Sequence, residues 1–167
     1  VTMNIYAQTG LDELDLKILA FLQRDGRTPY TQMAKALSVS EGTIRKRVKR
    51  LEDENYIKII GVADPFRIGL DTMVFIWIKV ERGELGDAMA KLVRLKQTRY
   101  VAYATGAFDL VAMAVVQSRQ GLLRFLNEEL GEISGIRETD TSVILGIRKQ
   151  AYDWISLRDG EELGVQR

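Results

Sequence analysis

The sequence predicts an α+β fold with two parts, an N-terminal winged helix-turn-helix domain and a ferredoxin-like βαββαβ domain. Before residue 55, apolar residues recur at helical spacing in three short segments. From residue 72, strand-like and amphipathic segments follow in the order strand, helix, strand, strand, helix, strand. We therefore expect a DNA-binding domain at residues 1–62, a linker at 63–71, a second domain at 72–149, and a tail at 150–167. The tail should pack on the core or on a neighbouring molecule.

The composition argues against several classes of protein. The chain of 167 residues has no histidine and no cysteine, which removes the commonest general base, thiol chemistry, disulfides and the usual zinc ligands. No apolar run is long enough to cross a membrane. The net charge is only +1, so any attraction for nucleic acid must come from local clustering. We expect a cytoplasmic protein that is not an enzyme and uses no cofactor, metal or membrane.

The first two helices have recognisable start and stop signals. Asp12 is expected to cap the first helix, which should end at Gly26. The second helix should begin with Thr28 as the N-cap and Pro29 at the first helical position, where its missing N–H costs nothing. Together with a third helix after a short turn, these elements predict a tri-helical domain.

The third helix combines an apolar stripe with a cationic face. Ser40 is expected to cap it, and Asn55 to close it in the left-handed conformation. At 3.6 residues per turn, one narrow stripe is formed by Ile44, Val48 and Leu51. Residues 56–62, YIKIIGV, are predicted to form the wing, a short strand or hairpin.

The opposite face of this helix is expected to bind double-stranded DNA. A basic helix presented after a helix-turn suits phosphate, and its first residues would enter the major groove. The expected contacts are Ser40, Gly42, Thr43, Arg45, Lys46, Lys49 and Arg50. Arg47 lies nearer the apolar stripe, which favours an internal ion pair or a flanking phosphate contact. A merely solvated helix face is the weaker explanation, because the charges coincide with a tri-helical pattern.

The predicted strands at residues 73–80 and 110–116 are apolar on both faces. In a ferredoxin-like sheet the helices cover only one face, so the other would expose a patch unusual for a monomer. We therefore expect a homodimer formed sheet to sheet, with an interface that includes Phe75, Trp77 and Met113. A two-fold dimer would also present two recognition helices to two half-sites.

Several motifs, in their order and spacing, resemble the Lrp/AsnC (feast/famine) family of transcriptional regulators. They are LDELDLKIL at 11–19, LSVS at 37–40, RVKRLE at 47–52, GAFDL at 106–110, LGEISGI at 130–136 and TDTSVIL at 139–145. The resemblance covers nearly the whole chain, from about Leu11 to Lys149.

The resemblance implies a DNA-binding transcription factor whose second domain binds an amino acid or related metabolite. It also implies dimers that assemble further, often to octamers. By position, the effector-binding residues would be Gly106, Asp109, Leu110, Thr139 and Thr141. A glycine lets a ligand approach the backbone, and a carboxylate can accept an α-ammonium group. Ordinary turn and strand roles explain the same residues equally well.

The sequence leaves two other functions open. One is a ligand sensor whose helix-turn-helix binds protein and not DNA, which the cationic third helix disfavours. The other is an enzyme, since decarboxylases of tetrapyrrole synthesis are similar to this family in overall fold. Histidines are thought to serve their chemistry, and this chain has none.

Overall fold

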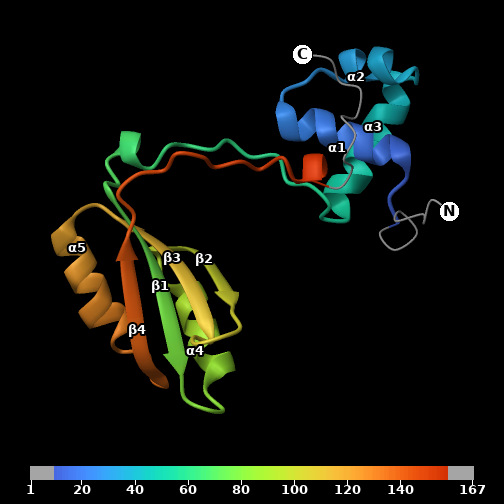
Figure 1. The fold of residues 1–167 in the computed structure, drawn as a ribbon. Helices are drawn as coiled ribbons and strands as arrows, with labels where there is room; N and C mark the ends of the chain where they lie inside the picture. Colours follow the sequence, from blue (N-terminus) through green and yellow to red (C-terminus); the bar gives the residue numbers. More distant parts are fainter. Residues whose placement is uncertain (1–9, 158–167) are drawn as a thin grey trace. The chain divides into compact units, whose positions relative to one another are not determined.

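The chain folds into two compact units (Figure 1). The computed structural model describes residues 10–157, so the outermost parts of the predicted first domain and tail, 1–9 and 158–167, lie outside the described residues. One unit contains the chain up to Gly61 together with the segment from Lys149 onward, and the other runs from Val62 to Arg148. The DNA-binding part expected from the sequence is thus built from two distant stretches of chain. Within residues 10–157, no helix is both long and apolar enough to cross a bilayer.

Three α-helices form most of the first unit. They are α1 (Glu13–Arg24), α2 (Tyr30–Leu37) and α3 (Glu41–Asp53). Asp12 caps α1 as predicted, in a capping box with Asp15: each carboxylate accepts the other residue's backbone N–H, at 2.9 and 3.0 Å. Ser40 caps α3 by accepting the N–H of Thr43 at 3.1 Å, and Asn55 has the predicted left-handed conformation (φ 61°).

The start of α2 differs from the prediction. Pro29 occupies the N-cap and the helix begins one residue later, at Tyr30. Thr28 is not the cap, because its hydroxyl donates to the carbonyl of Asp25 at 2.7 Å and so closes the turn after α1.

The predicted wing is wrong. Residues 57–64 form no strand, and within the described part of the chain they pair with no other segment. The N–H groups of Tyr56 and Ile57 both donate to the carbonyl of Leu51, at 2.8 and 3.3 Å, which folds the chain back over the end of α3. Ile57 packs against the helical core, whereas Ile59, Ile60 and Val62 are exposed.

The C-terminal segment completes the helical core. The short helix η4 (Trp154–Leu157) lies against α1. Ile155 is buried among the core residues of the three helices, and its N–H donates to Oε1 of Gln23 at 3.0 Å. Of the two positions predicted for the tail, the described part therefore packs on the chain's own core, in the N-terminal unit.

We expect Ile155→Ala to lower the free energy of unfolding of the first unit by about 2–4 kcal/mol, because it removes a buried side chain and leaves a cavity. Urea denaturation of the full chain would measure the loss. Trp154→Ala is the matched control, since its side chain is largely exposed. Equal effects of the two changes would contradict a core role for Ile155.

The second unit is a four-stranded antiparallel sheet with the order β2-β3-β1-β4. Its strands are β1 (Thr72–Val80), β2 (Thr98–Tyr103), β3 (Leu110–Val116) and β4 (Ile136–Val143). Its α-helices are α4 (Leu85–Arg94) and α5 (Arg119–Arg124), which continues as the π-helical segment η3 (Phe125–Leu130). A short 3-10 helix, η2 (Phe66–Ile68), precedes β1 in the segment predicted as a linker. This confirms the ferredoxin-like βαββαβ prediction.

The sequence predicts a last strand from roughly Arg137 to Arg148, and the observed strand is shorter. β4 ends at Val143, which pairs with Val74. The ladder has one further bond, from the N–H of Ile144 to the carbonyl of Met73 at 2.8 Å. Because β1 begins at Thr72, the residues beyond have no neighbouring strand to pair with.

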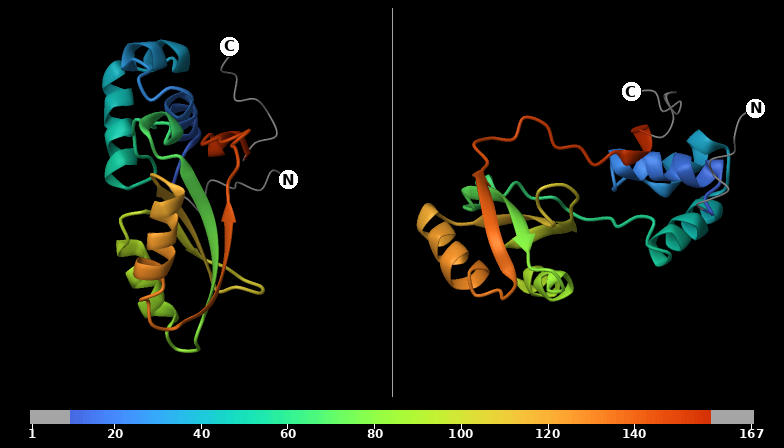
Figure 2. Two further views of the ribbon diagram at one scale, coloured as in Figure 1. Left: turned by 90° about the vertical axis from the view of Figure 1, so that its left-hand side faces the viewer. Right: turned by 60° about the horizontal axis from the view of Figure 1, so that its bottom comes forward.

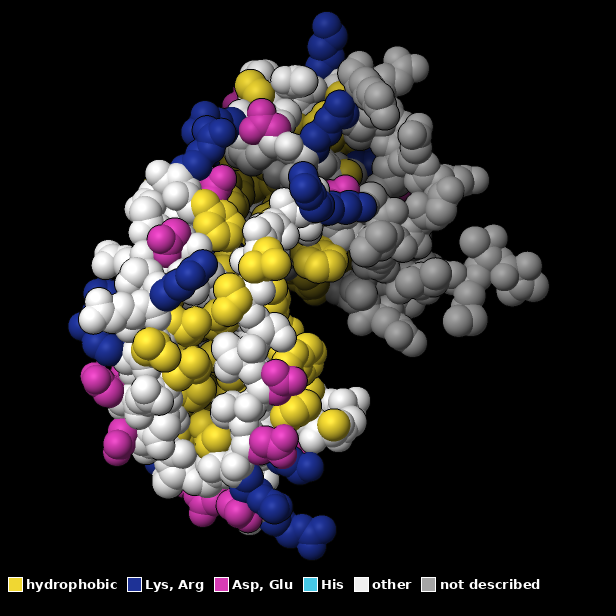
Figure 3. All heavy atoms as spheres, turned by 60° about the vertical axis from the view of Figure 1, so that its left-hand side comes forward, with side chains coloured by type: hydrophobic (Ala, Val, Ile, Leu, Met, Phe, Trp, Pro, Cys, Tyr) yellow, Lys and Arg dark blue, Asp and Glu magenta, His cyan; other side chains and the backbone are white. Residues whose placement is uncertain are grey.

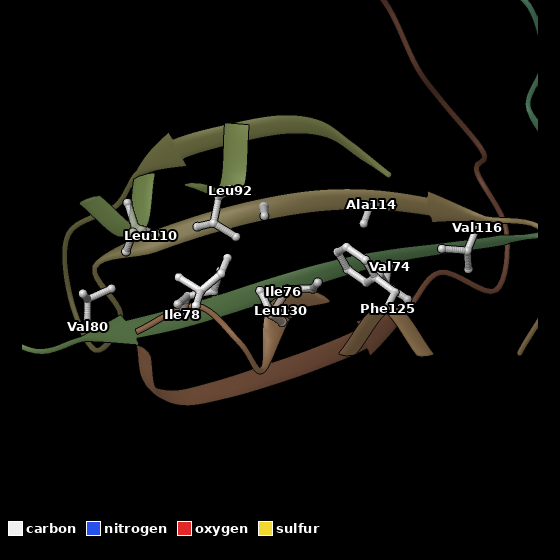
Figure 4. Close-up of a cluster of buried hydrophobic side chains, with 13 residues drawn as sticks. Val74, Ile76, Ile78, Val80, Leu92, Leu110, Ala114, Val116, Phe125 and Leu130 are labelled. Atoms are coloured by element: carbon white, nitrogen blue, oxygen red, sulfur yellow. The ribbon is translucent and has the colours of Figure 1, made fainter. Parts of the chain in front are cut away.

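Both helices cover the same face of the sheet (Figure 2). The core between the helices and the sheet contains alternate residues of β1 and β3, together with Leu92 and Phe125 from the helices (Figure 4). The intervening residues of the strands lie on the other face, which no helix of this unit covers. Among them, Phe75 pairs with Met113, and Trp77 pairs with Val111.

Candidate functional site

Two of the cations of α3 face an acidic pair on α1. Arg47 Nη1 lies 2.6 Å from Asp12 Oδ2 and 3.0 Å from Asp15 Oδ1. Arg50 also binds the Asp15 carboxylate, through Nη2. Asp15 is completely buried (0% exposed), so these guanidinium groups neutralise a charge that water cannot reach.

The acidic pair explains where Arg47 and Arg50 lie. Arg47 makes the internal ion pair that its position near the apolar stripe predicted. Arg50 was expected on the outer, DNA-facing side, and there the structure differs: its guanidinium turns back to Asp15. A helical wheel gives the direction of the Cα–Cβ bond, whereas the long arginine side chain follows the nearest buried carboxylate.

Opposing effects act on the pKa of Asp12. Burial raises it, but the hydrogen bonds from the Asp15 N–H and the Arg47 guanidinium outweigh burial, so the pKa lies below its ordinary value of 3.8. The same hydrogen bond to Asp12 raises the pKa of Arg47. At neutral pH the acid–base pair is therefore fully charged, which ties α3 to the first turn of α1.

Three other cations of α3 remain on its outer face: Arg45, Lys46 and Lys49 are exposed. Arg45 donates to Glu41 Oε1 at 2.8 Å, one helical turn earlier, whereas the two lysines have no ion-pair partner among the described residues. At the start of the helix, Gly42 is also exposed. Ser40 and Thr43 are engaged with each other in the cap, with their hydroxyl oxygens 2.9 Å apart.

The predicted effector residues do not converge on one hollow. Gly106 lies exposed in the β2–β3 turn with φ +111°, a conformation that favours glycine. Asp109 accepts the N–H of Val80 at 2.8 Å, and Leu110 is fully buried in the core. Thr139 and Thr141 pair with residues of β1 whose side chains face the helices.

A concave site does lie beside the β2–β3 turn, with different residues. Its volume is about 300 Å³, and it is lined by Trp77, Ala104, Thr105, Ala107, Phe108 and Asp140. The rings of Trp77 and Phe108 are 6.5 Å apart and tilted by 40°. Asp140 stands opposite Trp77 in the β1–β4 ladder, which puts its carboxylate on the uncovered face next to two aromatic rings. Of these lining residues the sequence had pointed only to Trp77, for the dimer interface; Asp140 lies between the two threonines predicted for the effector site.

The uncovered face of the sheet carries the apolar side chains expected at an interface. Phe75 and Met113 are half-buried, and Trp77 is 39% exposed on the central strand. Tyr100 extends the same face onto β2, because it pairs with Met113. Apolar side chains also reach the surface of this unit elsewhere, among scattered charged ones (Figure 3).

Comparison with known proteins decides the family. The model of the AsnC-type helix-turn-helix domain matches residues 11–52, and that of the Lrp/AsnC ligand binding domain matches residues 73–154. An uncharacterized HTH-type transcriptional regulator of Pyrococcus furiosus is 38% identical over 143 residues, which cover 85% of this chain and 97% of that protein. The chain belongs to the Lrp/AsnC family.

Other relatives agree with this assignment. The HTH-type transcriptional regulator FL11 of Pyrococcus furiosus is 33% identical, over 86% of this chain and 95% of its own. The structure of E. coli AsnC is similar with a TM-score of 0.78 and 28% identity, over 85% of this chain and 97% of that one. A Neisseria meningitidis transcriptional regulator, solved as a complex with L-Met, has the same fold: TM-score 0.78, 21% identity, 86% and 95% coverage.

As a member of the Lrp/AsnC family, the chain is a DNA-binding transcriptional regulator with a helix-turn-helix domain followed by a ligand-binding domain. Its curated relatives are regulators and not enzymes, which favours the regulatory function over the decarboxylase alternative.

Proposed function

We propose that α3 contacts duplex DNA through Arg45, Lys46 and Lys49, with Ser40, Gly42 and Thr43 next to the groove. The observation that carries this proposal is the division of the cations: two are held by buried acid, while three stay on the outer face of the helix. Arg47 and Arg50 stabilise the unit that presents the outer three. Arg50 is therefore not included among the groove-lining residues.

Changing both Lys46 and Lys49 to Ala should weaken binding to all duplexes. Each lysine that neutralises a phosphate contributes about 1 to the slope of log K against log salt, so the slope should fall by about 2 for each bound protomer. Gel shift or fluorescence anisotropy at several salt concentrations would measure it. Arg94→Ala with Lys96→Ala removes two exposed cations from the second unit and is the charge-matched control. If both double variants lose the same affinity, α3 is not the contact surface.

We further propose that the hollow lined by Trp77, Thr105, Phe108 and Asp140 binds a small amino acid. A volume of about 300 Å³ is at the lower end for ligand pockets and suits a small metabolite. The Asp140 carboxylate can accept an α-ammonium group, and the two aromatic rings can cover an apolar side chain. The L-Met complex of the Neisseria regulator supports an amino acid as the class of ligand.

Asp140→Asn should abolish any rise in melting temperature that an amino acid produces. A neutral amide keeps the shape of the site but no longer attracts the ammonium charge, so a screen of the common amino acids by thermal shift would detect the loss. Glu138→Gln is the control, because it removes another exposed carboxylate from the same strand. A response that survives in Asp140→Asn but disappears in Asp109→Asn would favour the β2–β3 turn residues predicted from the sequence.

The same face supports assembly as the route of regulation. We propose that two copies pair through Phe75, Trp77 and Met113, and that the hollow opens at the margin of this interface. A ligand that contacts Trp77 would then bind paired and unpaired protein with different affinity, and so shift the assembly equilibrium. Further association to an octamer, which the family resemblance implied, remains a prediction.

A further inference from the structure

Arg45 differs from the two lysines beside it, because two other residues hold its side chain. Its Nη2 donates to Glu41 Oε1 at 2.8 Å, and its Cζ lies 5.4 Å from the centre of the Tyr30 ring. The Arg45 side chain is nevertheless 68% exposed. One residue of α2 and one of α3 therefore orient the guanidinium, while most of the side chain stays exposed to solvent.

The Tyr30 ring is a fixed platform for that guanidinium. Tyr30 is the first residue of α2, and its ring is partly buried against the core of the three helices. A ring held by packing loses little further freedom when a cation stacks on it. The contact therefore restricts Arg45 and leaves the platform unchanged.

Glu41 carries a negative charge that suits the helix N-terminus but not a phosphate backbone. It lies in the first turn of α3, the part that a helix-turn-helix inserts into the major groove, where a carboxylate repels phosphate. Its negative charge would weaken purely electrostatic binding to any duplex. Paired with Arg45, however, it orients the planar guanidinium and discourages a simple phosphate contact.

We propose that Arg45 recognises a guanine in the major groove, and that Tyr30 and Glu41 are the positioning residues that hold its guanidinium for this contact. The inference rests on the proposed binding of DNA by α3. Guanine presents O6 and N7 side by side, and the planar fork of arginine binds both at once. One of its five donors binds Glu41, which leaves enough donors for the base.

The experiment compares base preference, not affinity alone. Selection of the full-length protein on random duplexes gives its preferred site, and each guanine in that site is then replaced singly. For Arg45→Lys and Tyr30→Leu we expect the preference for guanine at one position to fall about tenfold, with an unchanged salt slope. Tyr30→Phe keeps the aromatic face and should retain the wild-type preference for guanine. Lys46→Ala should weaken binding to every duplex alike.

Glu41→Gln gives a second, independent test at an exposed position. It should raise affinity for unrelated duplexes, because a repulsive charge is gone, while lowering the preference for guanine. Glu41→Gln still tests the proposal if Tyr30→Leu does not fold. A melting curve by circular dichroism would show whether Tyr30→Leu is folded. An unaltered base preference in Glu41→Gln, or in a folded Tyr30→Leu, overturns the positioning role. If the wild-type protein binds DNA but Lys46→Ala with Lys49→Ala binds as well as wild type, the proposed α3 contact itself has failed.

Discussion

Phe75→Asp should convert the proposed dimer into monomers. Phe75 is half-buried on the central strand β1, on the face that no helix of its unit covers, and pairs with Met113 of β3. Full burial of a phenylalanine side chain is worth about 1.5–3 kcal/mol, and pairing would bury about half of Phe75 in each of two copies, which is about 1.5–3 kcal/mol in total. The dissociation constant should therefore rise by about 10- to 10²-fold, and more if the new carboxylate is buried without a partner. Light scattering across a dilution series would measure the change.

The control for this experiment lies on the other side of the same unit. Leu123 on α5 is 60% exposed, so Leu123→Asp places the same charge on a face that the proposed interface does not use. It should leave the association unchanged. If Phe75→Asp remains dimeric at wild-type concentrations, or if Leu123→Asp dissociates equally, the sheet-to-sheet arrangement is wrong.

The sequence predicted best those features that depend on local chemistry. Asp12 and Ser40 cap their helices, and Asn55 adopts the left-handed conformation, because each signal acts within a few residues of itself. The strand Leu110–Val116 was predicted with its correct ends, since a long β-rich run between turn residues leaves few alternatives.

The errors concern features that depend on distant partners. The stretch after Asn55 has the composition of a strand, but a strand needs a neighbour, and none lies beside it in the described chain. The tail was predicted to pack either on the core or on a neighbour. The sequence could not choose between them, because the buried position of Ile155 depends on Gln23 and α1, more than 130 residues earlier.

The effector residues predicted on β4 and the residue proposed from the structure lie on opposite faces of that strand, and the sequence alone could not choose between the faces. Successive side chains on a strand point to opposite faces of the sheet. Which residues of β4 can line a site therefore depends on whether its odd- or its even-numbered residues face the helices. An apolar alternation would have indicated this, but Glu138 to Ser142 is polar on both faces. Only pairing with β1 separates Asp140, opposite Trp77, from Thr139 and Thr141 on the helix-facing side.

The cluster of Asp15 with Arg47 and Arg50 has a consequence for stability as well as for binding. The Asp15 carboxylate is fully buried and accepts the N–H of Asp12 as well as both guanidinium groups. These contacts join α1 to α3 across more than 30 residues of sequence, in addition to the apolar core. The Asp15 carboxylate therefore links α1 to α3, the helix proposed to contact DNA, together with the Asp12–Arg47 pair and the apolar core.

Asp15→Asn should destabilise the first unit by about 3 kcal/mol, at the lower end of the cost of breaking a buried ion pair. The lower end applies because Arg47 and Arg50 are about one-third exposed and can regain water, whereas a deeply buried partner could not. The amide also presents donors where the guanidinium groups need an acceptor. Urea denaturation would give the stability, and we expect DNA affinity to fall even where the variant is folded, because α3 loses both of its ion pairs with Asp15.

Glu13→Gln is the matched control for Asp15→Asn. Glu13 lies on the same helix and pairs with Lys17 at 2.5 Å, but its side chain is 71% exposed. An exposed pair of this kind is worth about 0–1 kcal/mol, so the change should be nearly silent in both assays. A stable Asp15→Asn protein with wild-type DNA affinity would mean that the apolar stripe of Ile44, Val48 and Leu51 alone sets the position of α3, and that the ion pairs merely neutralise a buried charge.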